Sequence, residues 1–120
     1  MSMKTFMAIL TGSADSAKHV PWDALSDEAR NARVGEGMAA WQAWMGKHAD
    51  QVADTGGPLG ATLRVNEDGI AEATNSISGY VIVQAESREA AARMFIGHPH
   101  FSIFPGDGVD IMEIAPIPGA

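Results

Sequence analysis

Two histidines and two aspartates lie in one short stretch near the end of the chain, GHPHFSIFPGDGVD from Gly97 to Asp110. In an extended segment, side chains two residues apart share a face, so His98 and His100 could point the same way. A divalent metal accepts two imidazoles plus a carboxylate such as Asp107 or Asp110, while a single imidazole could act as an acid or base. In the alternative, structural interpretation, His98 ends a helix whose C-terminus favours a cation, and His100 is a loop residue.

No third ligand stands at a defined spacing from this pair, so we predict neither a metal nor a cofactor. We predict His100 as the catalytic base, with Tyr80 and Asp107 assisting. Tyr80 begins an apolar strand, and its hydroxyl either faces a cleft or belongs to a dimer interface. Four further residues are predicted to contact a ligand: Trp22, Trp41, His98 and Phe101.

Trp22 belongs to the stretch KHVPWD, Lys18 to Asp23. A loop of this kind either folds over a cleft as a lid or is anchored to the core by its tryptophan. The glycine-rich stretch Gly56 to Gly60 follows a predicted helix. A phosphate cradle needs its glycines before a helix, so this stretch is not predicted to bind phosphate.

Composition limits the class of protein. The chain has 120 residues, a formal net charge of -7 and no cysteine. The length suits one domain spanning residues 1–120. The eight Lys and Arg residues are dispersed, which disfavours nucleic acid, and the acidic balance disfavours anionic membranes. The absence of cysteine fits a cytoplasmic protein.

Alternating apolar residues predict the strands. Met3 to Thr11 and the run YVIVQA, Tyr80 to Ala85, are apolar on both faces. Ala61 to Val65 and Ile70 to Ala73 flank a turn with Asp-Gly, which favours a hairpin. VDIMEI, Val109 to Ile114, is predicted as the last strand.

Apolar spacings of three and four predict the helices. Ser26 caps a short segment that runs to Arg33, after which Gly35 and Gly37 interrupt it. A long helix is then predicted from Met38 to Val52, with Gly56-Gly57-Pro58 as its stop. A second main helix is expected over the REAAARMFI stretch, capped by Ser87 and stopped by Gly97.

This order of elements predicts an α+β fold with a split βαβ plan, in which an antiparallel sheet carries two main helices on one face. Two strands are apolar on both faces, so something must cover the second face of the sheet. We predict that the same surface of another copy covers it, which gives a homodimer.

Three ordered stretches resemble the YCII-related (DGPF-containing) proteins. LSDEARNARVGEGMAAWQAWMGKHADQVADTGGPLG is similar to the helical half of that family, ISGYVIVQAESREAAARMF to its Gly-Gly-Tyr strand with the following helix, and VDIMEIAPI to its last strand. The resemblance implies a ferredoxin-like fold that dimerises through its sheets as a dimeric α+β barrel.

The chain also departs from this family. The turn NEDGIAEATN keeps Asp-Gly but lacks the Pro-Phe that follows in the family name. Some relatives resemble enzymes with a His–Asp pair at the start of the long helix, yet no histidine lies between Glu36 and Trp41. The resemblance implies a cofactor-free isomerase, dehydrochlorinase or monooxygenase acting on a small metabolite. The alternative is a dimeric ligand-binding or regulatory module without turnover.

Overall fold

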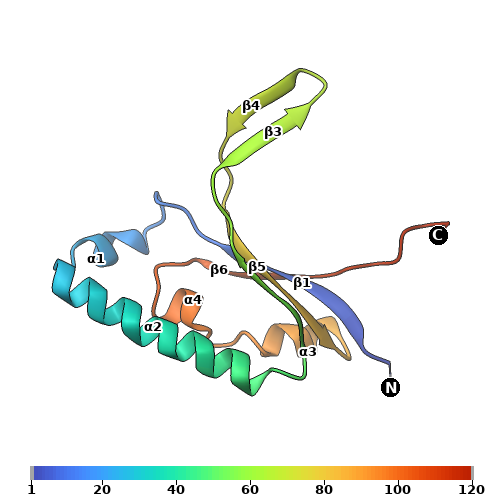
Figure 1. Ribbon diagram of the computed structural model, residues 1–120, viewed down its shortest axis with the longest axis horizontal. Coiled ribbons are helices and arrows are strands. Elements are labelled where there is room, and N and C mark those ends of the chain that lie inside the picture. Colours follow the sequence, from blue (N-terminus) through green and yellow to red (C-terminus); the bar gives the residue numbers. More distant parts are fainter. Residues whose placement is uncertain (1, 120) are drawn as a thin grey trace.

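The computed structural model describes residues 2–119 and contains an antiparallel four-stranded sheet with its helices on one face (Figure 1). The strands stand in the order β2 (Val52–Pro58), β5 (Ile77–Ala85), β1 (Lys4–Thr11) and β6 (Gly108–Glu113). β5 lies between β1 and β2 and runs antiparallel to both. The predicted α+β class and split βαβ plan are therefore confirmed.

Two helices make the connections across the sheet. α2 (Asp27–Lys47) joins β1 to β2, and α3 (Arg88–Arg93) leads from β5 toward β6. Each begins at the predicted serine cap, because the Ser26 hydroxyl accepts from the Ala29 amide and the Ser87 hydroxyl from the Ala90 amide, both at 3.1 Å.

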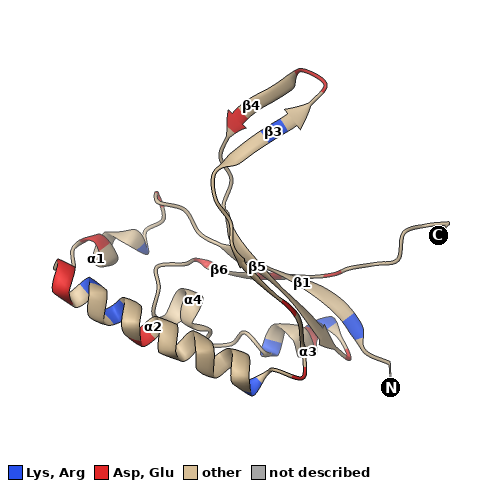
Figure 2. Ribbon diagram, in the orientation of Figure 1, with Lys and Arg blue, Asp and Glu red and all other residues tan. Residues whose placement is uncertain are grey.

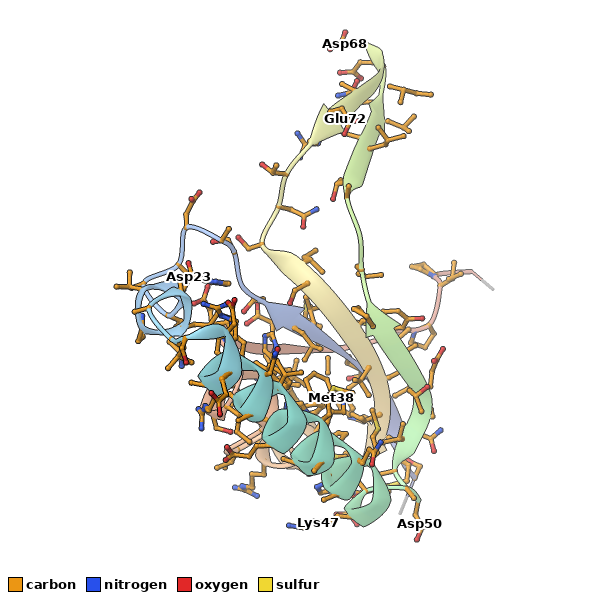
Figure 3. All side chains as sticks on the ribbon, turned by 60° about the vertical axis from the view of Figure 1, so that its left-hand side comes forward. Asp23, Met38, Lys47, Asp50, Asp68 and Glu72 are labelled. Carbon is orange, nitrogen blue, oxygen red and sulfur yellow. The ribbon has the colours of Figure 1, made fainter. Side chains whose placement is uncertain are left out.

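The core lies between these helices and one face of the sheet. Alternate strand residues supply the sheet side, and the helices with the segment after α3 supply the rest. Its buried members are Phe6, Ala8, Val81, Val83 and Ala85 from the strands, with Trp44, Ala91, Met94 and Phe95 opposite. Figure 3 shows Met38 of α2 turned toward the sheet, while Lys47 and Asp50 point outward at the helix end.

The predicted break at Gly35 and Gly37 is wrong, because α2 is one continuous helix of 21 residues. A single glycine costs a helix only about 1 kcal/mol, which tertiary packing outweighs here. Gly37 is buried, and a Cβ built on it would lie 2.5 Å from the Phe104 ring. The glycine therefore permits the Phe104 ring to pack closely against the helix.

The predicted extension of this helix to Val52 is also wrong, since the helix ends at Lys47 and Val52–Pro58 forms β2. The pairing of β2 with β5 shifts twice, on either side of Asp54. Gly56 has a φ of 61°, and any Cβ there would collide with the Tyr80 carbonyl oxygen. These glycines thus serve a close approach between two strands instead of a helix stop.

Two short helices were not predicted. α1 (His19–Asp23) lies within the KHVPWD stretch, and α4 (Pro99–Ser102) lies within the histidine-rich stretch. Pro99 occupies the first turn of α4, where a proline loses no hydrogen bond. His98 is the N-cap of α4 and His100 lies within it, so the two are not in one extended segment and the shared face expected for them does not apply.

The predicted hairpin is confirmed as β3 (Thr62–Asn66) and β4 (Gly69–Ala73). It forms a separate two-stranded sheet and projects away from the rest of the molecule, with Asp68 and Glu72 far from the helices (Figures 1 and 3). Figure 2 shows that acidic residues mark its tip, while acidic and basic residues both occur along α2.

The second face of the four-stranded sheet lies opposite the helices and is apolar at its centre, with Asp110 of β6 beside Ile9. Met7 pairs with Ile82, and Ile9 with Tyr80, at the centre of this face. Met112, the partner of Met7 on β6, is 50% exposed. We call this surface the open sheet face.

Among residues 2–119, no helix is long and apolar enough to cross a membrane.

Candidate functional site

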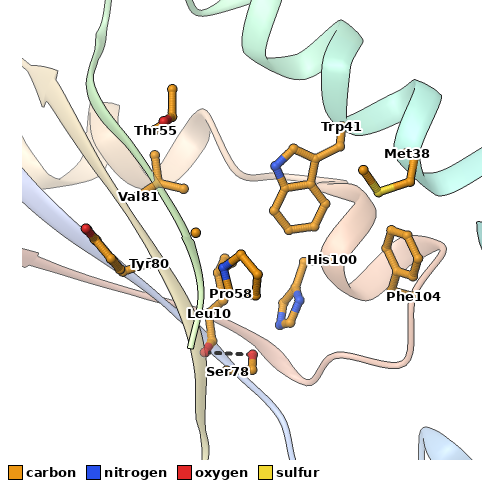
Figure 4. A pocket seen from close by; sticks show the side chains of 11 residues that line it. Leu10, Met38, Trp41, Thr55, Pro58, Ser78, Tyr80, Val81, His100 and Phe104 are labelled. Carbon is orange, nitrogen blue, oxygen red and sulfur yellow. Dashed lines mark hydrogen bonds between the residues drawn. The ribbon is translucent and has the colours of Figure 1, made fainter. Parts of the chain in front are cut away.

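A cavity of about 420 Å³ lies between α2, α4 and the edge of the sheet formed by β2 and β5 (Figure 4). Its walls are mostly apolar, with few polar side chains. The lining comprises Leu10, Met38, Trp41, Thr55, Gly57, Pro58, Ser78, Tyr80, Val81, His100 and Phe104. Cavities of this size that are apolar with few polar groups are typical of small-molecule sites.

His100 is held at this cavity by α4 and by β1. Its backbone amide donates to Nδ1 of His98 at 3.0 Å, which caps α4. Its Nε2 lies 2.8 Å from the carbonyl oxygen of Thr11. A carbonyl only accepts, so Nε2 carries the proton, and in the neutral ring Nδ1 keeps its lone pair.

The Nδ1 atom of His100 is free to accept a proton. Among residues 2–119 no hydrogen-bond partner is found for it, and it is not one of the fully buried polar atoms. His100 is only 8% exposed and lies in α4, so the alternative of a loop residue is wrong, although its ring is hydrogen-bonded. The cause is the short helix α4, which turns the ring inward against β1.

Gly106 allows the imidazole of His100 to occupy this position. A Cβ at Gly106 would lie less than 3.0 Å from Nε2, from Cε1 and from the carbonyl oxygen of His100. The Gly106 amide also donates to that carbonyl at 3.0 Å. The backbone of the Gly106 loop therefore packs directly on the imidazole, as only glycine permits.

His98 lies behind the cavity in a cluster of aromatic rings. Its ring centroid is 4.6 Å from that of Trp41 and 4.9 Å from that of Trp44, both edge-on. His98 is 1% exposed, and its Nε2 has no hydrogen-bond partner within residues 2–119. Nδ1 accepts from the His100 amide, so Nε2 carries the proton.

Burial, together with the positive charges that His100 and His48 can carry, lowers the pKa of His98 from 6.5 to about 4. His98 is therefore neutral near pH 7. It begins α4 instead of ending α3, so the expectation of a cation at a helix C-terminus is wrong. Its contribution here is to position His100 through the Nδ1 cap.

The two tryptophans of α2 have different positions, one in the core and one at the cavity. Trp44 is in the core, and its indole nitrogen donates to the Met94 carbonyl at 2.7 Å. Trp41, one turn earlier, lines the cavity between His98 and Phe104. The predicted ligand contact Trp41 thus lies at the cavity, with His98 directly behind it.

Tyr80 lines the same cavity as His100, but its phenol is turned away. Val81 is buried toward the helices, so the preceding side chain points to the opposite face. Figure 4 shows the Tyr80 ring and hydroxyl directed away from His100 and Trp41. Tyr80 contributes the edge of the cavity, while its hydroxyl lies on the open sheet face.

Asp107 does not reach this cavity. Its carboxylate accepts a hydrogen bond from the Ser16 hydroxyl on the exposed surface, and its amide donates to the Thr11 carbonyl at 2.9 Å. That carbonyl also accepts from His100, so the two residues share a backbone partner without facing one space. The predicted trio of His100, Tyr80 and Asp107 is thus not brought together.

Trp22 and Phe101 line a second, smaller hollow of about 250 Å³ beside α1. The Trp22 ring packs 6.0 Å from Phe104, and the Lys18 ammonium donates to the Phe101 carbonyl at 2.7 Å. Phe104 forms a wall shared with the main cavity. These contacts tie the KHVPWD stretch to the body of the protein.

Within residues 2–119 no group of three or more His, Cys, Asp or Glu residues is placed to hold a metal. Two residues that shape the cavity were missed in the sequence, Met38 and Gly106. Gly106 follows His100 by six residues, and nothing in the sequence indicates that a helix such as α4 will bring the two into contact.

Comparison with known proteins supports the fold. No family model and no curated protein matches the sequence. Among solved structures, the chain is similar to TftG, the 5-chloro-2-hydroxyhydroquinone dehydrochlorinase of Burkholderia phenoliruptrix AC1100, in its complex with 2,5-dihydroxybenzoquinone. The TM-score is 0.50 with 16% sequence identity, over 90% of each chain. The protein therefore has a mixed α+β fold like that of TftG, with an antiparallel sheet and helices.

Proposed function

We propose that this protein is a YCII-like, cofactor-free enzyme that removes a proton from a small, hydroxylated planar metabolite, with His100 as the base. One observation carries the proposal. The proton of His100 is fixed on Nε2 by the Thr11 carbonyl, which leaves an accessible lone pair on Nδ1 of a residue that lines an apolar cavity. The fold shared with a dehydrochlorinase adds support at the level of fold.

The reaction begins when the Nδ1 lone pair of His100 takes a proton from an O–H or C–H group of the substrate. The ring then carries a positive charge, which the Thr11 carbonyl stabilises through the hydrogen bond from Nε2. The electron pair left on the substrate forms a new double bond. In an isomerase the electron pair moves within the substrate and His100 returns its proton at another carbon. In a dehydrochlorinase the electron pair expels chloride, and His100 then releases its proton to solvent, so that the net loss from the substrate is HCl.

The apolar walls assist by excluding water and orienting a flat ring. Trp41, Met38 and Phe104 face Pro58 and Leu10 across the cavity (Figure 4). Trp22, Phe101 and His98 act from outside this cavity, with His98 holding α4 in place.

Among the other predicted catalytic residues, Tyr80 forms part of the wall, and Asp107 holds the loop after α4 through Ser16. Two hydroxyls line the cavity. Ser78 donates to the Leu10 carbonyl at 3.1 Å, so its oxygen can still accept from a substrate hydroxyl, while Thr55 lies on β2.

A binding or regulatory module without turnover is the second candidate. The observation that favours it is the small number of reactive groups at the cavity. Among the described lining residues, His100 is the titratable side chain with a free hydrogen-bond acceptor near the cavity. An apolar cavity with a single hydrogen-bonding histidine suffices for ligand recognition.

We also propose a single YCII-related domain, 1–120, that forms a cytoplasmic homodimer through the open sheet face. The apolar pairs Met7–Ile82 and Ile9–Tyr80 support this interface, because a sheet with two apolar faces needs cover on both.

Thermal shift against a panel of small metabolites that includes phenol, catechol, hydroquinone and 2,5-dihydroxybenzoquinone tests the proposal. We expect at least one compound to raise the Tm of the wild type and of Asp107→Asn, whose side chain lies outside the cavity. His100→Gln, which retains an amide donor toward Thr11, should lose that shift. Equal stabilisation of His100→Gln would refute the role of His100, and consumption of the compound by the wild type would distinguish the enzyme from the module.

A further inference from the structure

We propose that the hairpin β3–β4 is a dimerisation arm whose apolar side is buried by a second copy of this chain. The inference rests on the homodimer proposed above and adds a surface that the contact between open sheet faces does not contain. Both strands of the arm continue directly from strands of the main sheet, β2 before it and β5 after it.

One side of the arm is mostly apolar. It carries Val65 with its partner Ile70 and, two residues before Val65, Leu63 with its partner Glu72, which is the one charged residue among the four. The opposite side carries Arg64 and its partner Ala71. Larger apolar residues thus alternate with other residues along the arm, as in a pair of strands that buries one face. We infer that the side with Leu63, Val65 and Ile70 is buried in a complex.

This mostly apolar side is nevertheless exposed to solvent. Leu63 is 61% exposed, Val65 72% and Ile70 71%. Neither strand pairs with the four-stranded sheet, and the arm stands away from the body in Figure 1. An isolated two-stranded hairpin is marginally stable in water, so this arm needs a surface to pack against.

The total surface of the chain indicates how large that partner surface must be. The accessible area is 7,918 Å². A compact monomer of 12.6 kDa exposes about 6,200 Å², so this chain exposes roughly 1,700 Å² more. Stable dimers bury about 800 Å² per partner, and obligate ones bury 1,000 Å² or more. The surplus is thus of the size that one permanent partner would cover.

A second copy supplies the matching surface. In a twofold dimer whose open sheet faces meet, the arm of each copy continues from β2 and β5 beyond the sheet and can extend over the edge of the other copy, and each contact occurs twice. The open sheet face supplies Met7, Ile9 and Ile82 at its centre, with Asp110 beside Ile9. The arm and the open sheet face are the two apolar surfaces without cover among the described residues, and one symmetric association covers both.

The test compares Ile70→Lys with Ala71→Lys in the full chain. Both residues are exposed neighbours on β4, but they point to opposite sides of the arm. Sedimentation velocity should show a dimer for the wild type and for Ala71→Lys, with a dissociation constant at least about 30-fold higher for Ile70→Lys. Near-ultraviolet circular dichroism checks folding, because all three tryptophans lie in the body and none in the arm.

Each outcome decides the matter. A wild type that sediments as a 12.6 kDa monomer at 100 µM refutes the arm together with the homodimer. A dimer equally stable in both lysine variants, but dissociated by Ile82→Lys, refutes the arm and leaves the contact between open sheet faces. Equal dissociation of both arm variants refutes the assignment of the apolar side. Only selective loss of the dimer in Ile70→Lys supports the arm.

Discussion

His98 makes the stability of this protein depend on pH in a way that can be worked out from one residue. It is 1% exposed, in contact with Trp41 and Trp44, and burial lowers its pKa to about 4. In the unfolded chain its pKa is near 6.5. Between these two values the unfolded chain binds a proton that the folded protein does not.

The sign follows from this difference. Where the unfolded state binds more protons, stability rises with pH, so it falls as the pH drops through 6.5 toward 4. Between pH 7 and pH 4.5 the loss from His98 alone is about 2 kcal/mol. That is a large part of the 5–15 kcal/mol available to a typical domain.

The assay is urea unfolding followed by far-ultraviolet circular dichroism at pH 7.0, 5.5 and 4.5. Carboxylates also titrate in this range, so the informative quantity is the difference between the wild type and His98→Asn. Asparagine still caps α4 but does not titrate, so this variant should start less stable and lose about 2 kcal/mol less on acidification. His19→Asn, a substitution outside the aromatic cluster, controls for the loss of any histidine.

The reasoning would be refuted if the wild type and His98→Asn lost the same stability between pH 7.0 and pH 4.5. It would also be refuted if the wild type gained stability on acidification relative to the variant, because that would mean that the folded state favours the charged imidazole of His98.

Four further substitutions test how the site and the helices around it are positioned. Gly106→Ala should displace the His100 ring and abolish the thermal shift by any cavity ligand, whereas a retained shift would contradict the close packing of this loop. Gly35→Ala, with open space around it, should stabilise the protein by about 1 kcal/mol, while Gly37→Ala, which meets the Phe104 ring, should give no such gain in urea unfolding. Ser87→Ala should cost about 1 kcal/mol by removing the cap of α3, and an unchanged unfolding midpoint would contradict that role.

The fold was predictable where local and global signals agree. The run from Tyr80 to Ala85 alternates in burial as its pattern indicates, and the caps Ser26 and Ser87 stand where α2 and α3 begin. The hairpin was predictable from Asp-Gly, and Gly69 has a positive φ of 108°. The type I′ turn that Asp-Gly favours is not formed, because Asp68 does not adopt a positive φ.

The prediction failed where packing outweighs local preference. Gly37 was predicted to interrupt the helix, but it lies within α2, where the Phe104 ring packs against it. Gly56 reads as a helix stop, but it allows β2 to approach the Tyr80 carbonyl. Both depend on partners tens of residues away, which no local window contains.

The candidate site was predictable only in part. The stretch around His100 was singled out by residue type, and that residue does line the cavity. Asp107 was grouped with it by closeness in sequence, but α4 turns the chain so that the aspartate meets Ser16 on the surface. Proximity in sequence therefore located the loop but not the set of groups that converge.

The central claim is that His100 presents a free Nδ1 lone pair to a ligand in the cavity. Long-range ¹H–¹⁵N NMR on protein labelled at histidine, at a pH high enough for the neutral ring, reads both ring nitrogens directly. We predict that the His100 signals show a proton on Nε2, bound toward Thr11, and a bare Nδ1 whose resonance moves when a stabilising compound of the panel is added. A proton on Nδ1, or an Nδ1 resonance unchanged at saturating compound, would contradict the claim.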